Sequence, residues 1–191
     1  MRERLDREYF ETLYEQSPDP WSFETSPYER KKYERTLGVL QGRRYRRSLE
    51  VGCSIGVFTA MLAPLCNELW AVDVSERAVA AARKRLARFP HVGVEQRRLP
   101  EETPEGPFDL IVASEVLYYW PEEVMLAALR CFEELLAPGG VLLAVHWRKE
   151  TKTYPLQGDE VHELLLEHTR LANITAMVEP EYRLDLFEDR E

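Results

Sequence analysis

Two carboxylates and a turn of small residues form the part of this sequence best suited to bind a charged small molecule. Glu50 opens the stretch Glu50-Val51-Gly52-Cys53-Ser54-Ile55-Gly56, and Asp73 ends a second apolar run. A strand, a small-residue turn, a helix and a second strand that ends in an acid form a nucleotide-binding βαβ unit. We therefore expect Gly52 and Gly56 to let the backbone approach a ligand closely, with Glu50 and Asp73 as its polar contacts.

The glycine spacing indicates which ligand this is. A dinucleotide-binding turn follows G-x-G-x-x-G, whereas the last glycine here falls one residue early, and the Gly-Lys-Ser/Thr of a P-loop is absent. Glu50 is poorly placed for a phosphate and suits a cation, such as the amino group of an amino acid. Ser75 caps the helix that follows, which leaves the Asp73 carboxylate available. The pattern argues against a nicotinamide dehydrogenase.

Apolar periodicity places these residues in an α/β sandwich with a mostly parallel sheet. We predict one domain, 1–191, with an N-terminal helical lid or cap segment, 1–42, and an α/β core, 48–191. Helices are expected within 1–15 and at 27–41, 57–65, 76–88, 121–137 and 160–170. Strands are expected at 48–51, 69–72, 92–96, 108–114 and 141–147, followed by an antiparallel pair at 173–178 and 180–187.

Composition argues against several classes of protein. The 34 acidic residues outnumber the 25 basic ones, for a net charge of −9, which disfavours a nucleic-acid-binding surface. The basic run Arg43-Arg44-Tyr45-Arg46-Arg47 is a solvated lead-in to the first strand or a landing patch for an anionic substrate. The cysteines show no metal-binding spacing, and no signal peptide or membrane-spanning run is visible. We expect a cytoplasmic, metal-independent protein.

At this point the sequence resembles the class I S-adenosylmethionine-dependent methyltransferases, whose first motif is commonly E/D-x-G-x-G-x-G. Ser54 replaces the middle glycine, and stretches 108–112 and 136–142 match a later strand and turn of the family. The resemblance implies a Rossmann-like, mostly parallel seven-stranded sheet with a C-terminal antiparallel hairpin. It also implies S-adenosyl-L-methionine as cofactor, with Asp73 on the ribose hydroxyls.

A narrower resemblance covers nearly the whole chain. The stretches 19–21, 28–33, 50–56 and 114–119, together with Tyr154-Pro155-Leu156-x-Gly158-Asp159-x-Val161-His162, are similar to the nodulation protein S family. That family includes an N-methyltransferase acting on the free amino group of a chito-oligosaccharide.

The cofactor residues implied by these resemblances include one departure. Many class I members place an acid after strand three for the adenine, but Gln96-Arg97-Arg98-Leu99-Pro100 has none, so we expect backbone groups near Arg98 and Leu99 to hold the base. The N-terminal aromatics either cover the cofactor or simply pack their segment onto the sheet. The full set is Trp21, Tyr28, Tyr33, Glu50, Gly52, Cys53, Ser54, Gly56, Asp73, Val74, Arg98, Leu99 and Ser114.

Methyl transfer requires positioning and, for an ammonium or hydroxyl acceptor, removal of a proton. Candidates lie after the strands at 108–114 and 141–147, because open α/β sheets bind ligands at the carboxyl ends of their strands. His146 is the first candidate base, although it could be a hydrogen-bonded strand-end histidine. Glu115 could hold the acceptor or cap a turn. Candidate substrate contacts are Tyr118, Tyr119, Arg148 and His162, the last of which could instead fix its loop together with Asp159.

The sequence therefore predicts a methyltransferase that acts on an amine or hydroxyl of a small polar acceptor, with an amino sugar or oligosaccharide as the first candidate. O-methylation of a natural product and cofactor binding without turnover are the alternatives. We expect no nucleic-acid or membrane partner. The acceptor and the oligomeric state stay open.

Overall fold

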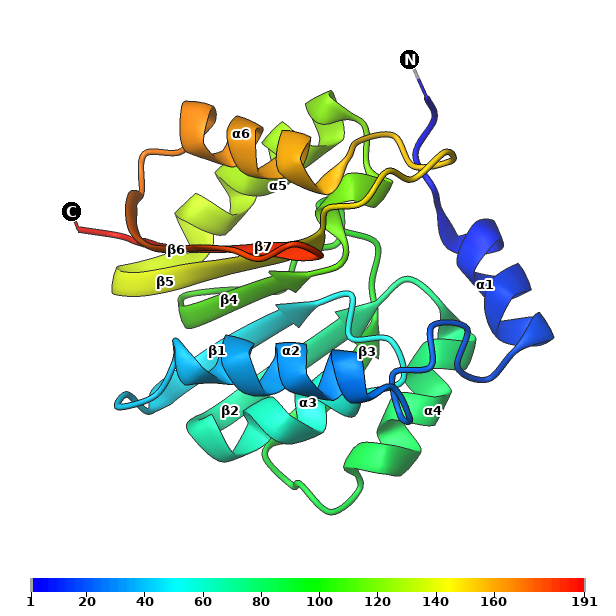
Figure 1. Ribbon diagram of the computed structural model, residues 1–191. Helices are drawn as coiled ribbons and strands as arrows, with labels where there is room; N and C mark the ends of the chain where they lie inside the picture. The colour runs from blue at the N-terminus through cyan, green and yellow to red at the C-terminus, as the bar shows by residue number, and fades with distance from the viewer. Residues whose placement is uncertain (1, 191) are drawn as a thin grey trace. The chain divides into compact units, whose positions relative to one another are not determined.

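The computed structural model describes residues 2–190, which group into two compact units. We call residues 6–97 the N-terminal unit, and residues 2–5 with 98–190 the C-terminal unit (Figure 1). Among the described residues, no helix is both long enough and apolar enough to cross a bilayer.

The N-terminal unit carries two helices followed by a β-α-β-α-β series. The helices are α1 (Arg7–Gln16) and α2 (Pro27–Gly38), and the series is β1 (Tyr45–Val51), α3 (Val57–Leu62), β2 (Cys66–Asp73), α4 (Glu76–Leu86) and β3 (Val92–Gln96). The strands are parallel, in the order β3-β2-β1. Val51 pairs with Val72, and Asp73 pairs with Gln96, so the three strands end at one edge of the sheet.

Local sequence signals set the helix starts in this unit. The Ser26 hydroxyl accepts the Glu29 N–H at 3.2 Å at the start of α2, and the Ser75 hydroxyl accepts the Ala78 N–H at 3.2 Å at the start of α4. Such caps satisfy amide groups that have no partner within the helix. The buried face of α4 then packs against the turn and strands in one core cluster: Cys53, Ala71, Val79, Ala82, Leu86 and Val94.

The C-terminal unit contains the other four strands. Its elements are β4 (Phe108–Ser114), α5 (Glu122–Leu135), β5 (Leu136–Trp147), α6 (Gly158–His168), β6 (Ala172–Val178) and β7 (Tyr182–Glu188). The strand order is β4-β5-β7-β6, with β4 and β5 parallel and β7 antiparallel to both of its neighbours. Helices α5 and α6 lie side by side over these strands (Figure 1).

The predicted fold class is confirmed, because residues 2–190 form seven strands, and within each unit the strands are parallel except at the C-terminal hairpin. Several boundaries differ, most clearly at β5, which begins at Leu136, whereas a helix was expected up to 137 and a turn from 138 to 140. Leu136 pairs with Phe108, and a register shift before Leu110 accommodates Gly139 at a φ of +72°. The basic run enters β1 at Tyr45, earlier than expected, and Arg47 lies over the Trp70 ring of β2. The division into a lid segment and a core stays a prediction.

Candidate functional site

Every second residue of the turn after β1, from Gly52 to Gly56, has a left-handed backbone conformation. Gly52, Ser54 and Gly56 have φ angles of 74°, 51° and 77°. A side chain in this conformation costs about 1–2 kcal/mol, which explains why glycine suits all three positions and why Ser54 is an exception. A Cβ on Gly56 would also lie 3.1 Å from the Cβ of Ala82. The glycines therefore give both the shape of the turn and the close approach of α3 to α4.

Asp73 fixes this turn from the end of β2. Its Oδ2 accepts the Ser54 N–H at 2.8 Å, and its Oδ1 accepts the Ser75 N–H at 2.9 Å. Ser75 caps α4 as predicted, but the Asp73 carboxylate is also engaged. Burial raises the pKa of Asp73 from 3.8 to about 6, against the effect of these hydrogen bonds. A carboxylate offers about four lone-pair sites, so acceptor capacity remains for ribose hydroxyls.

Glu50 is a buried carboxyl group with an unsatisfied oxygen. The residue is 3% exposed, and its Oε2 has no hydrogen-bond partner among residues 2–190. Burial raises the pKa of Glu50 from 4.5 to about 8. Because an unpaired buried polar atom is costly, this group is suited to receive a cationic partner. The residues present therefore fit the amino group of a methionine moiety.

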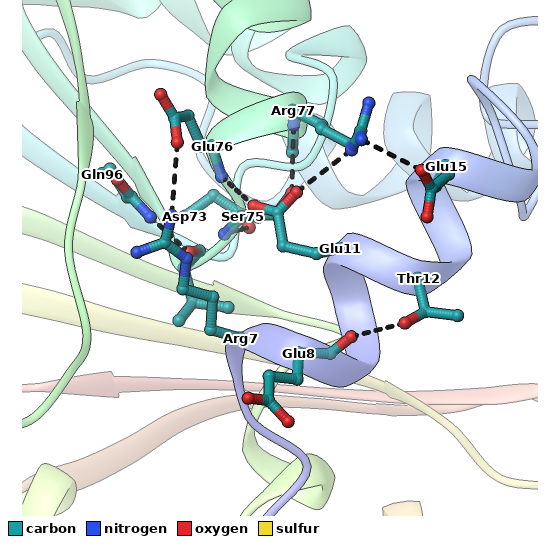
Figure 2. Close-up of polar contacts among 12 residues, drawn as sticks. Arg7, Glu8, Glu11, Thr12, Glu15, Asp73, Ser75, Glu76, Arg77 and Gln96 are labelled. Carbon is teal, nitrogen blue, oxygen red and sulfur yellow. Dashed lines mark hydrogen bonds and ion pairs between the residues drawn. The ribbon is translucent and has the colours of Figure 1, made fainter.

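Helix α1 holds the turn and the start of α4, a role that the sequence did not reveal. The hydroxyls of Tyr14 and Ser54 are 2.5 Å apart, and Tyr14 is buried. Figure 2 shows Glu11 reaching the first turn of α4, where its Oε1 accepts the Glu76 N–H at 2.5 Å. Arg77 lies 3.4 Å from the Glu11 carboxylate. In the sequence, Tyr14 looks like an ordinary member of an apolar helical stripe, and no local signal distinguishes it.

Gln96 is a second residue that the sequence analysis did not single out. It ends β3 beside Asp73, and its side-chain amide donates to the Val74 carbonyl at 3.0 Å (Figure 2). The amide thus ties the end of β3 to the residue after Asp73. An amide at the end of a strand that adjoins a candidate acid was the only available signal.

The N-terminal aromatics pack their segment onto this unit. The Trp21 ring lies edge-on to Tyr14 at 5.8 Å and stacked on Phe23 at 5.5 Å. Tyr33 is buried, with its ring 5.0 Å from that of Phe58 in α3. The Tyr28 ring lies 5.6 Å from the Lys32 ammonium. These contacts agree with the packing interpretation, and contact with the cofactor stays a prediction.

The backbone groups expected to hold adenine have partners inside the C-terminal unit. The Arg98 N–H donates to Glu102 at 2.8 Å, and the Leu99 carbonyl accepts a hydrogen bond from Arg4. The Arg98 N–H is thus already engaged, whereas the Leu99 carbonyl keeps a second lone pair. Contact of Arg98 and Leu99 with adenine stays a prediction.

The candidate acceptor residues after β4 form a connected group in the C-terminal unit. Glu115 has a φ of 55°, and its Oε2 accepts the Tyr118 hydroxyl at 2.5 Å and the Trp147 N–H at 2.9 Å. The Tyr118, Tyr119 and Tyr154 rings lie 4.7–5.0 Å apart. Burial raises the pKa of both Tyr118 and Tyr119, so the phenols stay neutral. Ser114 lies half-buried at the end of β4.

The surroundings of His146 argue against the predicted role as general base. The side chain is fully buried, its Nε2 accepts the Leu117 N–H at 3.2 Å, and its Nδ1 lies 3.1 Å from Nε2 of His162. His162 is equally buried, with Nδ1 2.6 Å from the Asp185 carboxylate. Neither ring has a nitrogen left for an acceptor. The alternatives, a hydrogen-bonded strand-end histidine and a residue that fixes its loop, fit the geometry.

Arg148 is likewise engaged within the protein. Its Nε and Nη2 donate to the two oxygens of Asp159 at 2.7 and 3.0 Å, and its Nη1 donates to the Glu179 carbonyl at 2.8 Å. Arg148 in turn holds the pKa of Asp159 below its usual value. A bidentate pair of this kind is specific in geometry. The pair with Asp159 holds Arg148, the first residue of the loop after β5, in place. This engagement argues against the predicted substrate contact.

Comparison with known proteins places this geometry in a family. The family model described as nodulation protein S matches residues 10–177. Nodulation protein S of Bradyrhizobium diazoefficiens is 39% identical over 127 residues, 65% of this chain and 61% of that protein. A relative of the same name from Rhizobium tropici is 38% identical over 128 residues, 65% of this chain and 53% of its own length. The chain thus spans less than two thirds of the length of these relatives.

Solved structures extend the match over most of the chain. The N-methyltransferase NodS from Bradyrhizobium japonicum WM9, in complex with S-adenosyl-L-homocysteine, aligns with a TM-score of 0.87 and 29% identity, covering 97% of this chain and 100% of that one. A putative methyltransferase from Pseudomonas syringae aligns with a TM-score of 0.74 and 41% identity, covering 84% and 98%. By its motifs, its fold and these matches, the chain belongs to the nodulation protein S family.

Proposed function

We propose that the protein is a methyltransferase that moves a methyl group from S-adenosyl-L-methionine to an amine of a small polar acceptor, with an amino sugar or oligosaccharide first. The observation that carries the proposal is the buried, unsatisfied carboxyl group of Glu50 beside a turn that Asp73 fixes. Family membership supports the cofactor, and the N-methyltransferase in the family supports an amine over a hydroxyl.

The N-terminal unit supplies the cofactor side of this proposal. The Glu50 carboxylate pairs with the ammonium of the methionine moiety, which compensates the cost of burying it. Asp73 receives the ribose hydroxyls, and the left-handed turn brings the Gly52 backbone close to the ligand. When bound, the cofactor supplies a methyl group activated by a sulfonium centre.

The C-terminal unit supplies the acceptor side. An amine must be neutral to act as a nucleophile, so the protein must orient it and receive its proton. With His146 set aside as general base, Glu115 is the remaining catalytic candidate, and it carries a carboxylate. Its strained backbone and its bonds to Tyr118 and Trp147 hold it at the end of β4. Strain of this kind is concentrated at functional sites. Glu115 therefore binds the acceptor amine in this proposal, beside Tyr118.

Two experiments test these parts separately. Calorimetry with S-adenosyl-L-homocysteine tests the cofactor side, and absence of both heat and thermal stabilisation would contradict it. Transfer of labelled methyl groups to a glucosamine tetramer tests the acceptor side, with the fully N-acetylated tetramer as matched control.

Each outcome of the transfer assay assigns a function. Label in the free-amine tetramer alone supports the proposal. Label in the N-acetylated tetramer indicates O-methylation. Activity only on unrelated amines or hydroxyls excludes a sugar as the acceptor. Cofactor binding without transfer to any member of a broad acceptor set indicates a binding protein.

A further inference from the structure

The two buried histidines belong to a chain of hydrogen bonds that crosses the C-terminal unit. It runs from the Leu117 amide to His146 on β5, then to His162 on α6 and to Asp185 on β7, over distances of 3.2, 3.1 and 2.6 Å. His146, His162 and Asp185 are all 0% exposed. Residues from three different elements thus form one line of hydrogen bonds that begins at a single backbone N–H.

The direction of this chain is fixed by its first member. A backbone N–H can only donate, so Nε2 of His146 must be the unprotonated nitrogen and Nδ1 must carry the proton. His146 then donates to Nε2 of His162, which leaves the proton of His162 on Nδ1, facing Asp185. Asp185 also accepts from Asn173 and Arg183, each at 2.9 Å. Both histidines are therefore neutral, and Asp185 is the charged end of the chain.

A glycine brings α6 close enough for this chain to form. A Cβ on Gly158 would clash with the Trp147 carbonyl oxygen and would lie 3.4 Å from the Cβ of His146. Gly158 and His162 are four residues apart on α6, and residues at this spacing share a helix face. The close approach at Gly158 therefore brings His162 within reach of His146.

The chain ends at the turn that carries the candidate acceptor residues. Leu117 begins the short 3-10 helix Leu117–Tyr119, and the next residue on β5, Trp147, donates its N–H to Glu115. Two consecutive residues of β5 thus hold both ends of the segment from Glu115 to Leu117. Tyr118, which follows, donates its hydroxyl to the same oxygen of Glu115.

We propose that Asp185, His162 and His146 form a positioning relay that fixes the turn Leu117–Tyr119 and so sets Glu115 and Tyr118 for the acceptor. The relay acts by keeping Nε2 of His146 unprotonated, so that it accepts the Leu117 N–H, and none of its members touches the acceptor. Its role in turnover rests on the proposed function, whereas its geometry can be tested independently.

Nitrogen-15 NMR of the histidine rings in the 191-residue protein tests which nitrogen of each ring donates and which accepts. His146 and His162, assigned with the single variants His146→Phe and His162→Phe, are expected as neutral rings protonated on Nδ1 from pH 6 to pH 8. A proton on Nε2 of either ring, or protonation to the charged form within this range, would overturn the relay.

Hydrogen exchange measured by mass spectrometry tests the positioning. In His162→Phe, peptides covering 115–120 should exchange about tenfold faster, because a buried donor or acceptor loses its partner, while peptides within 45–96 stay unchanged. Gly158→Ala should have the same effect with every relay side chain intact. His168→Phe, on the exposed face of α6, is the matched control and should behave as wild type. Unchanged exchange at 115–120 in both His162→Phe and Gly158→Ala refutes the proposal.

Turnover supplies the functional arm. With the glucosamine tetramer, His162→Phe should lower kcat/KM for the acceptor at least about tenfold and leave the affinity for S-adenosyl-L-homocysteine within about twofold. Wild-type turnover in a variant whose turn exchanges faster would overturn the positioning role. A wild-type protein inactive on the tetramer contradicts the acceptor assignment, and ring tautomers and exchange then decide the relay.

Discussion

Replacing Glu50 by glutamine should make the unliganded protein more stable at alkaline pH and should weaken cofactor binding. The carboxyl group is 3% exposed and lacks a hydrogen-bond partner for Oε2 within the described chain, and burial raises its pKa from 4.5 to about 8. Glutamine has the same shape and stays neutral. The variant therefore removes the cost of a buried charge and also the charge that a ligand ammonium needs.

The pH dependence follows from proton linkage. Between pH 4.5 and about 8, the folded chain keeps a proton on Glu50 that the unfolded chain has released, so the free energy of unfolding falls as the pH rises through this window. At about 1.4 kcal/mol for each pH unit, the loss is on the order of 5 kcal/mol. Asp73, whose pKa is also raised, to about 6, lowers stability with rising pH in both proteins. The difference between the two curves therefore isolates Glu50.

Urea denaturation at pH 5, 7 and 9 measures this difference. The E50Q variant should lose less stability than wild type as the pH rises. Calorimetry at pH 7 should show S-adenosyl-L-homocysteine binding at least about 30-fold more weakly to E50Q, since breaking a buried charge pair costs about 2–5 kcal/mol. Glu8→Gln, at an exposed position on α1 (Figure 2), is the matched control. An E50Q protein with the wild-type pH slope, or with wild-type affinity, would refute the reasoning.

Three further substitutions probe the rest of the site. Tyr14→Phe removes the hydroxyl that holds Ser54 and should lower the free energy of unfolding by about 1 kcal/mol. Calorimetry should show a several-fold loss of affinity for S-adenosyl-L-homocysteine. Unchanged values in both assays would contradict the role of α1. Asp73→Asn turns an amide donor toward a backbone N–H, so thermal unfolding should shift down and the same affinity should fall about tenfold. Arg148→Ala releases the loop after β5 and should speed limited proteolysis of this loop without changing cofactor affinity. A loop as resistant to protease as in wild type would show that the Arg148 hydrogen bonds are dispensable.

Local signals determined most of the fold and part of the site. The apolar runs ending at Val51, Asp73 and Ser114 are strands because each is bounded by turn residues, and helix caps at Ser26 and Ser75 act within three residues of their own position. The same local spacing led to the turn whose glycines have positive φ. These features depend on neighbours in the chain, so the sequence alone determined them, and the resemblance of this turn to a methyltransferase motif implied the cofactor.

Tertiary structure decided what the polar side chains do. His146, His162 and Asp185 come from three different elements, and only their packing shows that the two rings face each other and not an acceptor. The bond between Tyr14 and Ser54 joins residues 40 apart in sequence. The raised pKa of Glu50 follows from burial, which no local pattern of residues specifies. Hydrogen-bond partners and desolvation depend on contacts between distant segments, and for that reason the roles of these residues could be assigned only from the structure.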